Sequence, residues 1–381
     1  MFIASALTYL VVTLFSLRLS GDGGGAATKR DFAALLKIID ELYIGEYDED
    51  LLASEAMKAA VESLGDRWSY YMTPDEYVYF MDLSNNRYAG IGIGVAQDES
   101  TDLIKVLSVY GGSAAETAGL LADDLILAID NEDIAGFTIG EMGDLLSREI
   151  GDDVDLTILR PDGSVVTITV VYSYVFVDPV QYEMLSGDIG YISVSNFDYG
   201  AADSFIAAAG ELIDQGTRAF VFDVRMNGGG RVSEMTGMLD YLLPEGEIFI
   251  AVDRSGVETI TLSDADMVDL PCVVLVDRNS YSAAEYFAAT LSEYGYASVV
   301  GEQTSGKNRM QTTYTMPGGG ALHLSTSQYL TKNRVSLYDV GGLTPDYLIV
   351  LDDDEYELLL SGNVDMEDDP HIQKALSLLK Y

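Results

Sequence analysis

Ser282 stands where an apolar run gives way to a segment with helical spacing of apolar residues. The run 274–276 reads Val-Leu-Val, and a short turn of polar and small residues separates it from the serine. At such a strand-to-helix turn the hydroxyl lies at a helix N-terminus, where backbone N–H groups stabilise an anion. The N–H of Ala283 is then the natural donor to an oxyanion. The same position is also typical of an ordinary helix N-cap.

Lys307 offers the base that a serine nucleophile needs. It follows Ser282 by 25 residues and lies between glycine-bearing turns rather than in a helical pattern. A neutral lysine can take the proton from a serine hydroxyl. This requires burial that lowers the amine's pKa from about 10.4 to about 7–8. Gln311 could orient the amine without adding charge. The alternative is a surface lysine in a loop.

The scarcity of histidine and cysteine excludes other chemistries. The chain contains two histidines, His323 and His371, and one cysteine, Cys272. A zinc site built from these residue types is therefore not expected. A classical serine hydrolase would need one of the two histidines, and His323 sits within an expected strand without a partner motif. The glycines at 228–230 lack the downstream Lys-Ser/Thr of a P-loop, so we expect neither a metal nor a cofactor.

A glycine-rich segment in the middle of the chain resembles the peptide-binding loop of a PDZ domain. Consecutive backbone N–H groups in such a segment can hold an anion, and the strand that follows can accept an added peptide strand. The segment 111–120 and the expected strand pair 154–159 and 165–170 complete the resemblance. It implies that the terminal carboxylate of a peptide is held by Ala89, Gly90, Ile91 and Gly92.

The chain as a whole, from about residue 35 onward, resembles the S41 family of carboxyl-terminal processing (tail-specific) peptidases. The family's serine segment falls on Ser282, its lysine on Lys307, and the glutamine four residues later on Gln311. Its Asn-Pro-Gly-Gly turn corresponds to 227–230, and its Gly-Ile-x-Pro-Asp element to 342–346. The resemblance implies a serine endopeptidase with a Ser-Lys(-Gln) centre that cleaves proteins near their C-termini.

The same resemblance places the remaining parts of the site. Gly229 and Gly230 correspond to the glycines beside the oxyanion, with Ala283 as a further donor. Several positions depart from the family pattern without removing a catalytic group: Tyr281, Ala284, Asn308, Gly228 and Ala114. Tyr281 is expected to affect cleavage specificity, and Arg160 is a candidate for the PDZ arginine that activates some members. The alternative function is a catalytically silent peptide-binding scaffold, which would be expected to lack Ser282, Lys307 or Gln311.

Length and charge limit the classes of protein further. With 381 residues the chain is long enough for two or three domains. Its 62 acidic and 21 basic residues give a net charge of −41. This charge argues against nucleic acid as a partner and against a polybasic membrane-surface protein. The expected partners are protein or peptide substrates with free C-termini, and self-association into a homo-oligomer stays open.

We predict an α+β multidomain protein in which a PDZ-like β-rich domain precedes an α/β peptidase core of the S41 (ClpP/crotonase-like) type. Helices are expected from about residue 31 to 42, from Ser54 to Leu64, from Thr73 onward and at Ile372–Leu379. The expected core strands are Ile189–Val194, Ala219–Val224, Val273–Asp277, Ser298–Val300 and Leu322–Tyr329. The predicted divisions are a signal or anchor segment with its linker (1–30), a helical region (31–86), the PDZ domain (87–172), the peptidase core (173–352) and an acidic, helical tail (353–381).

The amino-terminal segment 2–17 is apolar and uncharged and precedes a glycine-rich linker. Its length is short for a membrane-spanning helix but sufficient for a secretory signal or an uncleaved anchor. We therefore expect export, to the cell exterior or to a membrane-anchored position facing the exterior or periplasm.

Overall fold

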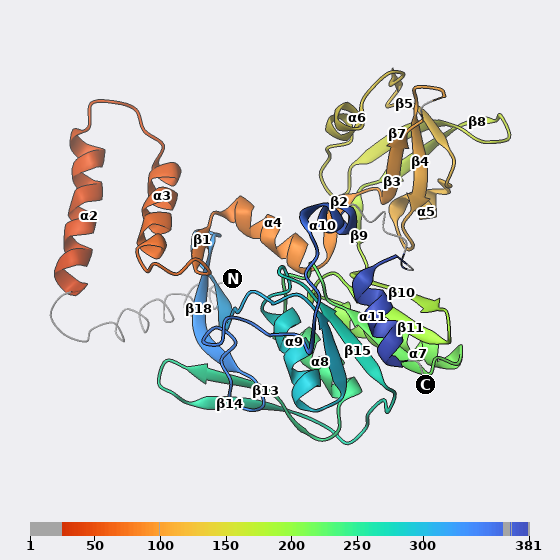
Figure 1. Cartoon of the computed structure of the whole chain (residues 1–381). Coiled ribbons are helices and arrows are strands. Elements are labelled where there is room, and N and C mark those ends of the chain that lie inside the picture. Colours follow the sequence, from red (N-terminus) through yellow and green to blue (C-terminus); the bar gives the residue numbers. More distant parts are fainter. Residues whose placement is uncertain (1–24, 99, 361–365, 367, 380–381) are drawn as a thin grey trace. The chain divides into compact units, whose positions relative to one another are not determined.

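The computed structural model describes residues 25–98, 100–360, 366 and 368–379 (Figure 1). The apolar segment 2–17 lies outside these residues. Within them, no helix combines the length and the apolar character needed to cross a membrane. The chain divides into two compact units, residues 1–60 and 61–381, and each is described by itself.

Two helices, α2 (Gly25–Leu42) and α3 (Glu49–Glu62), account for most of the described part of the first unit. The helix predicted from Ser54 begins five residues earlier, at Glu49. The reason lies just before it, because the carboxylate of Asp48 accepts a hydrogen bond from the N–H of Leu51 at 2.9 Å. This contact satisfies a donor that would be unpaired at the helix N-terminus.

The predicted PDZ domain is built on an antiparallel sheet in the order β3-β4-β5-β7-β8. Its elements are β3 (Ile93–Gln97), β4 (Ile104–Val109), α5 (Ala114–Ala118), β5 (Leu125–Ile129), β6 (Glu132–Asp133), α6 (Ile139–Leu145), β7 (Asp153–Leu159) and β8 (Val165–Val171). Alternate residues of β7 are buried, as expected for a strand with one face on a core. A separate strand pair, β2 (Arg87–Gly90) with β9 (Ser173–Phe176), joins the segments that enter and leave the domain.

The predicted peptidase core contains a sheet in the order β10-β11-β12-β15-β16-β19, parallel except at β10. The strands are β10 (Val180–Leu185), β11 (Ile189–Val194), β12 (Ala219–Asp223), β15 (Cys272–Val276), β16 (Ala297–Gly301) and β19 (Tyr347–Leu348). Every residue of β12 and β15 is buried, which fits parallel strands covered on both faces. Four of the five core strands predicted from the sequence lie in this sheet, and their ends agree with the prediction to within one residue. The fifth, predicted at 322–329, spans residues 321–330 and belongs to a second sheet.

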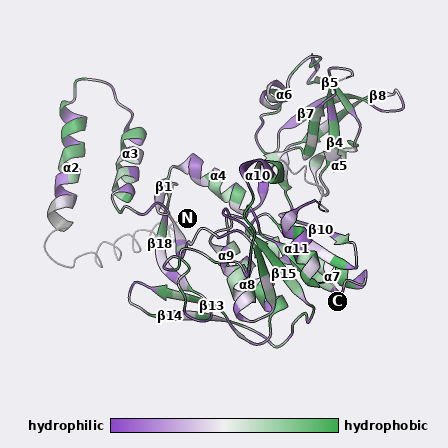
Figure 2. Cartoon of the chain, in the orientation of Figure 1, coloured by the Kyte–Doolittle hydropathy of each residue, from purple (hydrophilic) through white to green (hydrophobic). Residues whose placement is uncertain are grey.

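Helices cover both faces of this sheet. One face packs against α7 (Ala201–Asp214), α8 (Val232–Leu242) and α9 (Ala283–Glu293). The other face receives the C-terminal helix α11 (Pro370–Leu379) through Ile372, Ala375 and Leu379. Figure 2 shows the hydrophobic residues concentrated on β15 and the helices beside it. The α/β core is therefore confirmed.

In the described part of the chain, a second sheet contains five strands. Its order is β1-β18-β13-β14, with β17 also paired to β18. The strands are β1 (Tyr70–Met72), β13 (Gly246–Asp253), β14 (Glu258–Ser263), β17 (Arg309–Thr315) and β18 (Ala321–Leu330). Tyr70 pairs with His323 across β1 and β18. Part of the segment expected to be helical therefore contributes a strand to this sheet.

Two further helices flank the core. The capped start expected at Thr73 is confirmed in α4 (Pro74–Ser84), where Thr73 and Glu76 exchange hydrogen bonds in a capping box. The helix α10 (Asp353–Leu360) follows β19 and precedes the residues that the structure does not describe.

Candidate active site

Ser282 occupies the turn between β15 and α9 in a conformation that non-glycine residues rarely adopt. Its φ is 60° and its ψ is −121°. Such a conformation costs on the order of 1–3 kcal/mol and persists only where the surroundings hold it. The backbone N–H of Ser282 donates to the carboxylate of Glu285 at 2.9 Å, which fixes the strained turn.

Glu285 is a fully buried carboxylate that joins the serine turn to the lysine turn. Its Oε2 accepts the N–H of Ser282 at 2.9 Å and that of Lys307 at 3.0 Å. Its Oε1 accepts the N–H of Gly306 and the hydroxyl of Thr304, both at 2.5 Å. Burial raises the pKa of Glu285, and these hydrogen bonds oppose that rise. One side chain therefore sets the relative position of both turns.

The amine of Lys307 lies against aromatic rings in a partly buried site. Its Nζ is 4.2 Å from the ring centroid of Trp68 and 5.9 Å from that of Tyr281. Burial lowers the pKa of Lys307 to about 8, and the positive charge of Arg67 adds to this effect. Asp66 and Glu285 act in the opposite direction. A cation–π contact also favours the charged amine, but desolvation is the largest cause.

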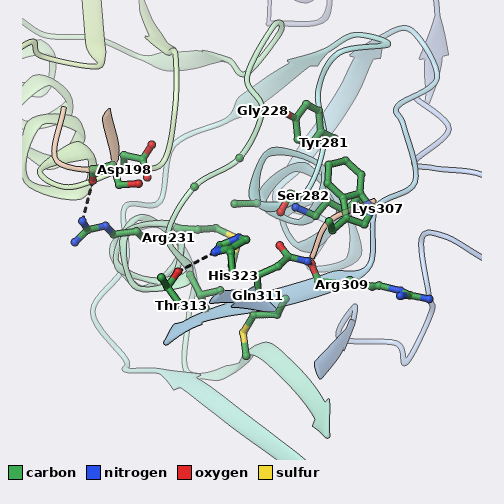
Figure 3. A pocket seen from close by; sticks show the side chains of 18 of the residues that line it. Asp198, Gly228, Arg231, Tyr281, Ser282, Lys307, Arg309, Gln311, Thr313 and His323 are labelled. Atoms are coloured by element: carbon green, nitrogen blue, oxygen red, sulfur yellow. Dashed lines mark hydrogen bonds between the residues drawn. The ribbon is translucent and has the colours of Figure 1, made fainter. Parts of the chain in front are cut away.

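A cavity of about 970 Å³ brings the predicted catalytic residues together. Ser282, Lys307 and Gln311 line it, as do Gly229, Gly230, Ala283 and Tyr281 (Figure 3). Among the described residues, no hydrogen bond joins the Ser282 hydroxyl to the Lys307 amine. The side-chain nitrogen of Gln311 donates to the carbonyl of Arg309 at 3.1 Å and to the hydroxyl of Ser325 at 3.0 Å.

The glycine turn beside Ser282 has a backbone that only glycine fits well. Gly229 has a φ of +92°, and an added Cβ would lie 2.8 Å from the Cβ of Ser282. Gly230 has a φ of +148°, and its Cβ would lie 2.4 Å from the carbonyl carbon of Phe197. The N–H of Gly229 donates to the side chain of Asn227 at 2.8 Å. This donor is therefore engaged within the turn itself.

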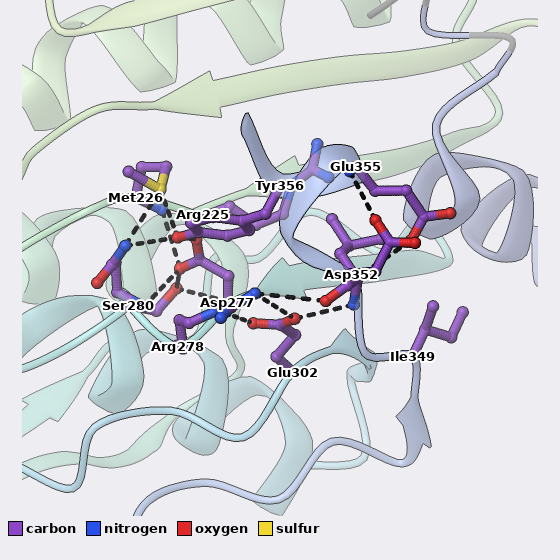
Figure 4. A network of polar contacts seen from close by, with 12 residues as sticks. Arg225, Met226, Asp277, Arg278, Ser280, Glu302, Ile349, Asp352, Glu355 and Tyr356 are labelled. Atoms are coloured by element: carbon purple, nitrogen blue, oxygen red, sulfur yellow. Dashed lines mark hydrogen bonds and ion pairs between the residues drawn. The ribbon is translucent and has the colours of Figure 1, made fainter. Parts of the chain in front are cut away.

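A buried carboxylate connects the glycine turn to the segment that precedes Ser282 (Figure 4). Oδ1 of Asp277 accepts the N–H of Met226 and the N–H of Asn279, both at 3.0 Å. Oδ2 of Asp277 accepts the hydroxyl of Tyr356, from α10, at 2.9 Å. The guanidinium of Arg278 lies 4.1 Å from the ring of Tyr356. The helix α10 thus contacts both loops of the candidate site.

Several residues of the site could not be singled out from their local sequence. Trp68, the only tryptophan of the chain, precedes β1 and contacts Lys307. The buried Tyr329 donates its hydroxyl to the carbonyl of Lys307. Its phenol also interacts with the side chain of Ser282. The only feature of the sequence that distinguishes Trp68 is that it is the single tryptophan, and this alone does not indicate a role in the site.

His323 lines the same cavity but has a packing role. Its ring lies 4.9 Å from that of Tyr70 and 5.3 Å from that of Phe80. Its Nδ1 is 2.8 Å from the hydroxyl of Thr313. Burial, with a contribution from Lys307, lowers the pKa of His323 to about 4. The imidazole is therefore neutral at ordinary pH.

In the PDZ domain, the loop 91–92 packs tightly against the start of α5. The carbonyl of Ile91 accepts the N–H of Ala115 at 2.9 Å. Gly92 has a φ of +87°, and an added Cβ would lie 2.3 Å from that of Ser113. The strand β3 that follows is at the end of the sheet, so one edge can pair with a peptide. Arg160 forms an ion pair with the buried Asp124 at 3.1 Å.

Comparisons with known proteins agree with this organisation. Residues 188–349 match the peptidase family S41, and residues 105–160 match the PDZ domain. A carboxy-terminal-processing protease of Bartonella bacilliformis is 30% identical over 327 residues, which cover 84% of this chain and 74% of the relative. A carboxyl-terminal-processing protease of Picosynechococcus sp. is 29% identical over 333 residues, which cover 86% of this chain and 79% of the relative.

A solved structure from Bacteroides fragilis, described as that of an S41 protease, shares the fold with a TM-score of 0.53 and 19% identity, covering 88% of this chain and 92% of that chain. The parallel core, the serine turn and the preceding PDZ domain thus define a serine peptidase. The chain belongs to the S41 family, among the carboxyl-terminal processing proteases.

Proposed function

We propose that the chain cleaves protein substrates near their C-termini, with Ser282 as nucleophile and Lys307 as general base. The observation that carries this assignment is the shared cavity, in which Glu285 joins the strained serine turn to the turn that bears the partly buried Lys307. The lowered pKa of about 8 leaves part of Lys307 neutral near neutral pH, as a base requires.

In the proposed reaction, neutral Lys307 takes the proton of the Ser282 hydroxyl, and Oγ attacks the carbonyl carbon of the scissile bond. The oxyanion receives hydrogen bonds from the N–H groups of Ala283 and the glycine turn. The N–H of Gly229 donates to the side chain of Asn227, so to bind the oxyanion this donor exchanges that acceptor for it. The ammonium of Lys307 then gives its proton to the leaving amine, and water hydrolyses the acyl-enzyme with Lys307 again as base.

Lys307 is held in place through its backbone, because Tyr329 donates its hydroxyl to the Lys307 carbonyl. Gln311, which lines the same cavity, is proposed to orient the amine toward Ser282.

The PDZ domain is proposed to capture the free C-terminus of the substrate. Ala89, Gly90, Ile91 and Gly92 would hold the terminal carboxylate, and the tail would extend the sheet at β3. A substrate whose terminal carboxylate is converted to an amide should therefore be cleaved less efficiently, chiefly through a higher KM. Equal kcat/KM for both forms would contradict the assignment.

The decisive experiment is cleavage of a tailed reporter protein by the wild-type chain, Ser282→Ala and Lys307→Ala. Both variants should lose more than about 1,000-fold in kcat/KM while keeping the wild-type circular dichroism spectrum. Ser255→Ala and Lys332→Ala, which change residues outside the cavity, serve as matched controls. A folded Lys307→Ala chain with substantial activity would refute the dyad.

We also propose that the segment 2–17 directs export, supported by its apolar, uncharged composition. A fusion of residues 1–30 to alkaline phosphatase, which is active only outside the cytoplasm, tests this. An inactive, well-expressed fusion would exclude the proposal.

A further inference from the structure

The cavity around Ser282 has a charge opposite to that of the whole chain. The chain carries 62 acidic and 21 basic residues. The cavity, in contrast, is lined by four basic residues and by one carboxylate, Asp198. The basic residues are Arg67, Arg231, Lys307 and Arg309. Figure 3 shows Arg231 and Asp198 on one side of the cavity and Lys307 and Arg309 on the other.

Two of these arginines have their charge offset by neighbours. Arg309 forms an ion pair with Asp66 at 3.2 Å. Arg231 donates to two neutral acceptors, the carbonyl of Ser84 and the side chain of Asn85, and its charge lowers the pKa of nearby Asp198. Burial is the larger effect on Asp198 and raises its pKa to about 6, so at alkaline pH this carboxylate is ionised and opposes Arg231.

Arg67 is the cation that is left without such a partner. Its guanidinium stacks on Trp68, with Cζ 4.2 Å from the ring centroid. Among the described residues it has neither an ion pair nor a hydrogen bond. The amine of Lys307 lies at the same distance from the same ring, so the two cationic groups are separated by no more than twice that distance. Arg67 is exposed to solvent and lines the same cavity as Lys307.

The local charge should dominate over the charge of the whole chain in this cavity. Exposed charges are screened over about 8 Å at physiological ionic strength. The many carboxylates elsewhere on the surface therefore contribute little to the potential felt by a bound peptide. A stacked guanidinium presents its planar edge to a carboxylate and can bind it through two hydrogen bonds.

We propose that the cleft selects substrates with an acidic side chain close to the scissile bond, and that Arg67 is the specificity-determining residue that binds this carboxylate. The inference rests on the proposed function, because it requires that cleavage occurs in this cavity. It predicts a preference for aspartate or glutamate over the uncharged isosteres asparagine and glutamine.

The test uses a set of quenched fluorescent peptides that share one cleavage position, determined by mass spectrometry. Each residue within three positions of the scissile bond is in turn Glu or Gln, and every peptide is made with a free and with an amidated C-terminus. Measurements are made above the acid limb of all variants, so that the protonation of Lys307 does not differ. At one position at least, the wild-type kcat/KM should be roughly 3- to 30-fold higher for Glu than for Gln.

Arg67→Gln should reduce this Glu/Gln ratio to near one, and Arg67→Glu should invert it. Arg218→Gln is the matched control. Arg218 directly precedes the first residue of β12 and does not line the cavity. Its ratio should equal that of the wild type. Raising the salt concentration should lower the wild-type ratio.

The outcomes separate this inference from the proposed function. Cleavage of Glu and Gln peptides with equal kcat/KM at every position would overturn the acidic preference and leave the peptidase intact. A ratio that is unchanged in Arg67→Gln would overturn the role of Arg67. A preference that depends on the terminal carboxylate rather than on the side chain would also overturn it. Failure of the wild type to cleave any peptide or tailed reporter would refute the proposed function itself.

Discussion

The amine of Lys307 lies 4.2 Å from the centroid of the Trp68 ring. Trp68 is therefore part of the environment that keeps water from the proposed base. Because desolvation disfavours the charged amine, this contact helps to lower the pKa of Lys307 to about 8.

Activity should rise with pH as Lys307 loses its proton, with an acid limb near pH 8. Replacing Trp68 with alanine exposes the amine, so its pKa should rise toward 10.5 and the acid limb should move to higher pH. Trp68→Phe, which retains a ring, should shift it less. The measurement is kcat as a function of pH for the three chains. A limb that stays in place or moves downward in Trp68→Ala would show that the ring does not act by desolvation.

His323→Ala should leave the acid limb where it is in the wild type. Burial already lowers the pKa of this imidazole to about 4, well below the limb. Gln311→Glu should move the limb upward, because a negative charge beside the amine favours its protonated form. If His323→Ala removes the limb while Gln311→Glu leaves it unchanged, histidine is the base and the lysine assignment is wrong.

Glu285→Gln should impair both catalysis and stability. The amide keeps the size of the side chain but replaces one acceptor oxygen with a donor, although four donors point at the carboxylate. We expect a loss of about 1–3 kcal/mol in the free energy of unfolding and roughly a 10- to 100-fold loss in kcat from the displaced turns. Denaturant titration and single-turnover kinetics measure the two effects. A wild-type kcat in Glu285→Gln would show that catalysis does not depend on Glu285 joining the serine turn to the lysine turn.

Gly230→Ala should inactivate the chain. An added Cβ would lie 2.4 Å from the carbonyl carbon of Phe197, so the turn beside Ser282 must shift. Gly187→Ala is the control, since Gly187 also has a positive φ, +84°, but its Cβ would meet nothing within 4 Å. The control should lose only about 1–2 kcal/mol of stability and keep its activity. Comparable kcat/KM in both variants would mean that the close approach to Phe197 is unimportant.

Tyr356→Phe should lower kcat by roughly 3- to 10-fold without changing KM. The change removes the hydroxyl that donates to Asp277, whose other oxygen holds Met226 and Asn279. The turns on both sides of the scissile carbonyl then lose a shared restraint, whereas the substrate-binding surfaces stay as they are. Tyr338→Phe, at an exposed position, is the control. An equal rise in KM, or an effect of the same size in Tyr338→Phe, would contradict this positioning role.

The parts of this protein that depend on local sequence pattern could be predicted without the structure. The apolar runs of the core strands, the turn at Ser282 and the interval to Lys307 are short-range features, and the structure places both residues in one cavity. The capped start of α4 at Thr73 follows from a pattern of four residues. The edge position of β3 follows from the resemblance of one domain to PDZ domains.

The environment of these residues depends on contacts between segments that are distant in the sequence. Trp68 reaches Lys307 because β1 pairs with β18, two strands that are far apart in the sequence. Tyr356 reaches Asp277 because α10 folds back onto the loops of the core. Such contacts depend on long-range strand pairing and helix docking, which periodicity within a segment does not encode. Because burial sets the pKa of Lys307 and the strain at Ser282 is held by Glu285, the chemistry of the site is a property of the folded chain.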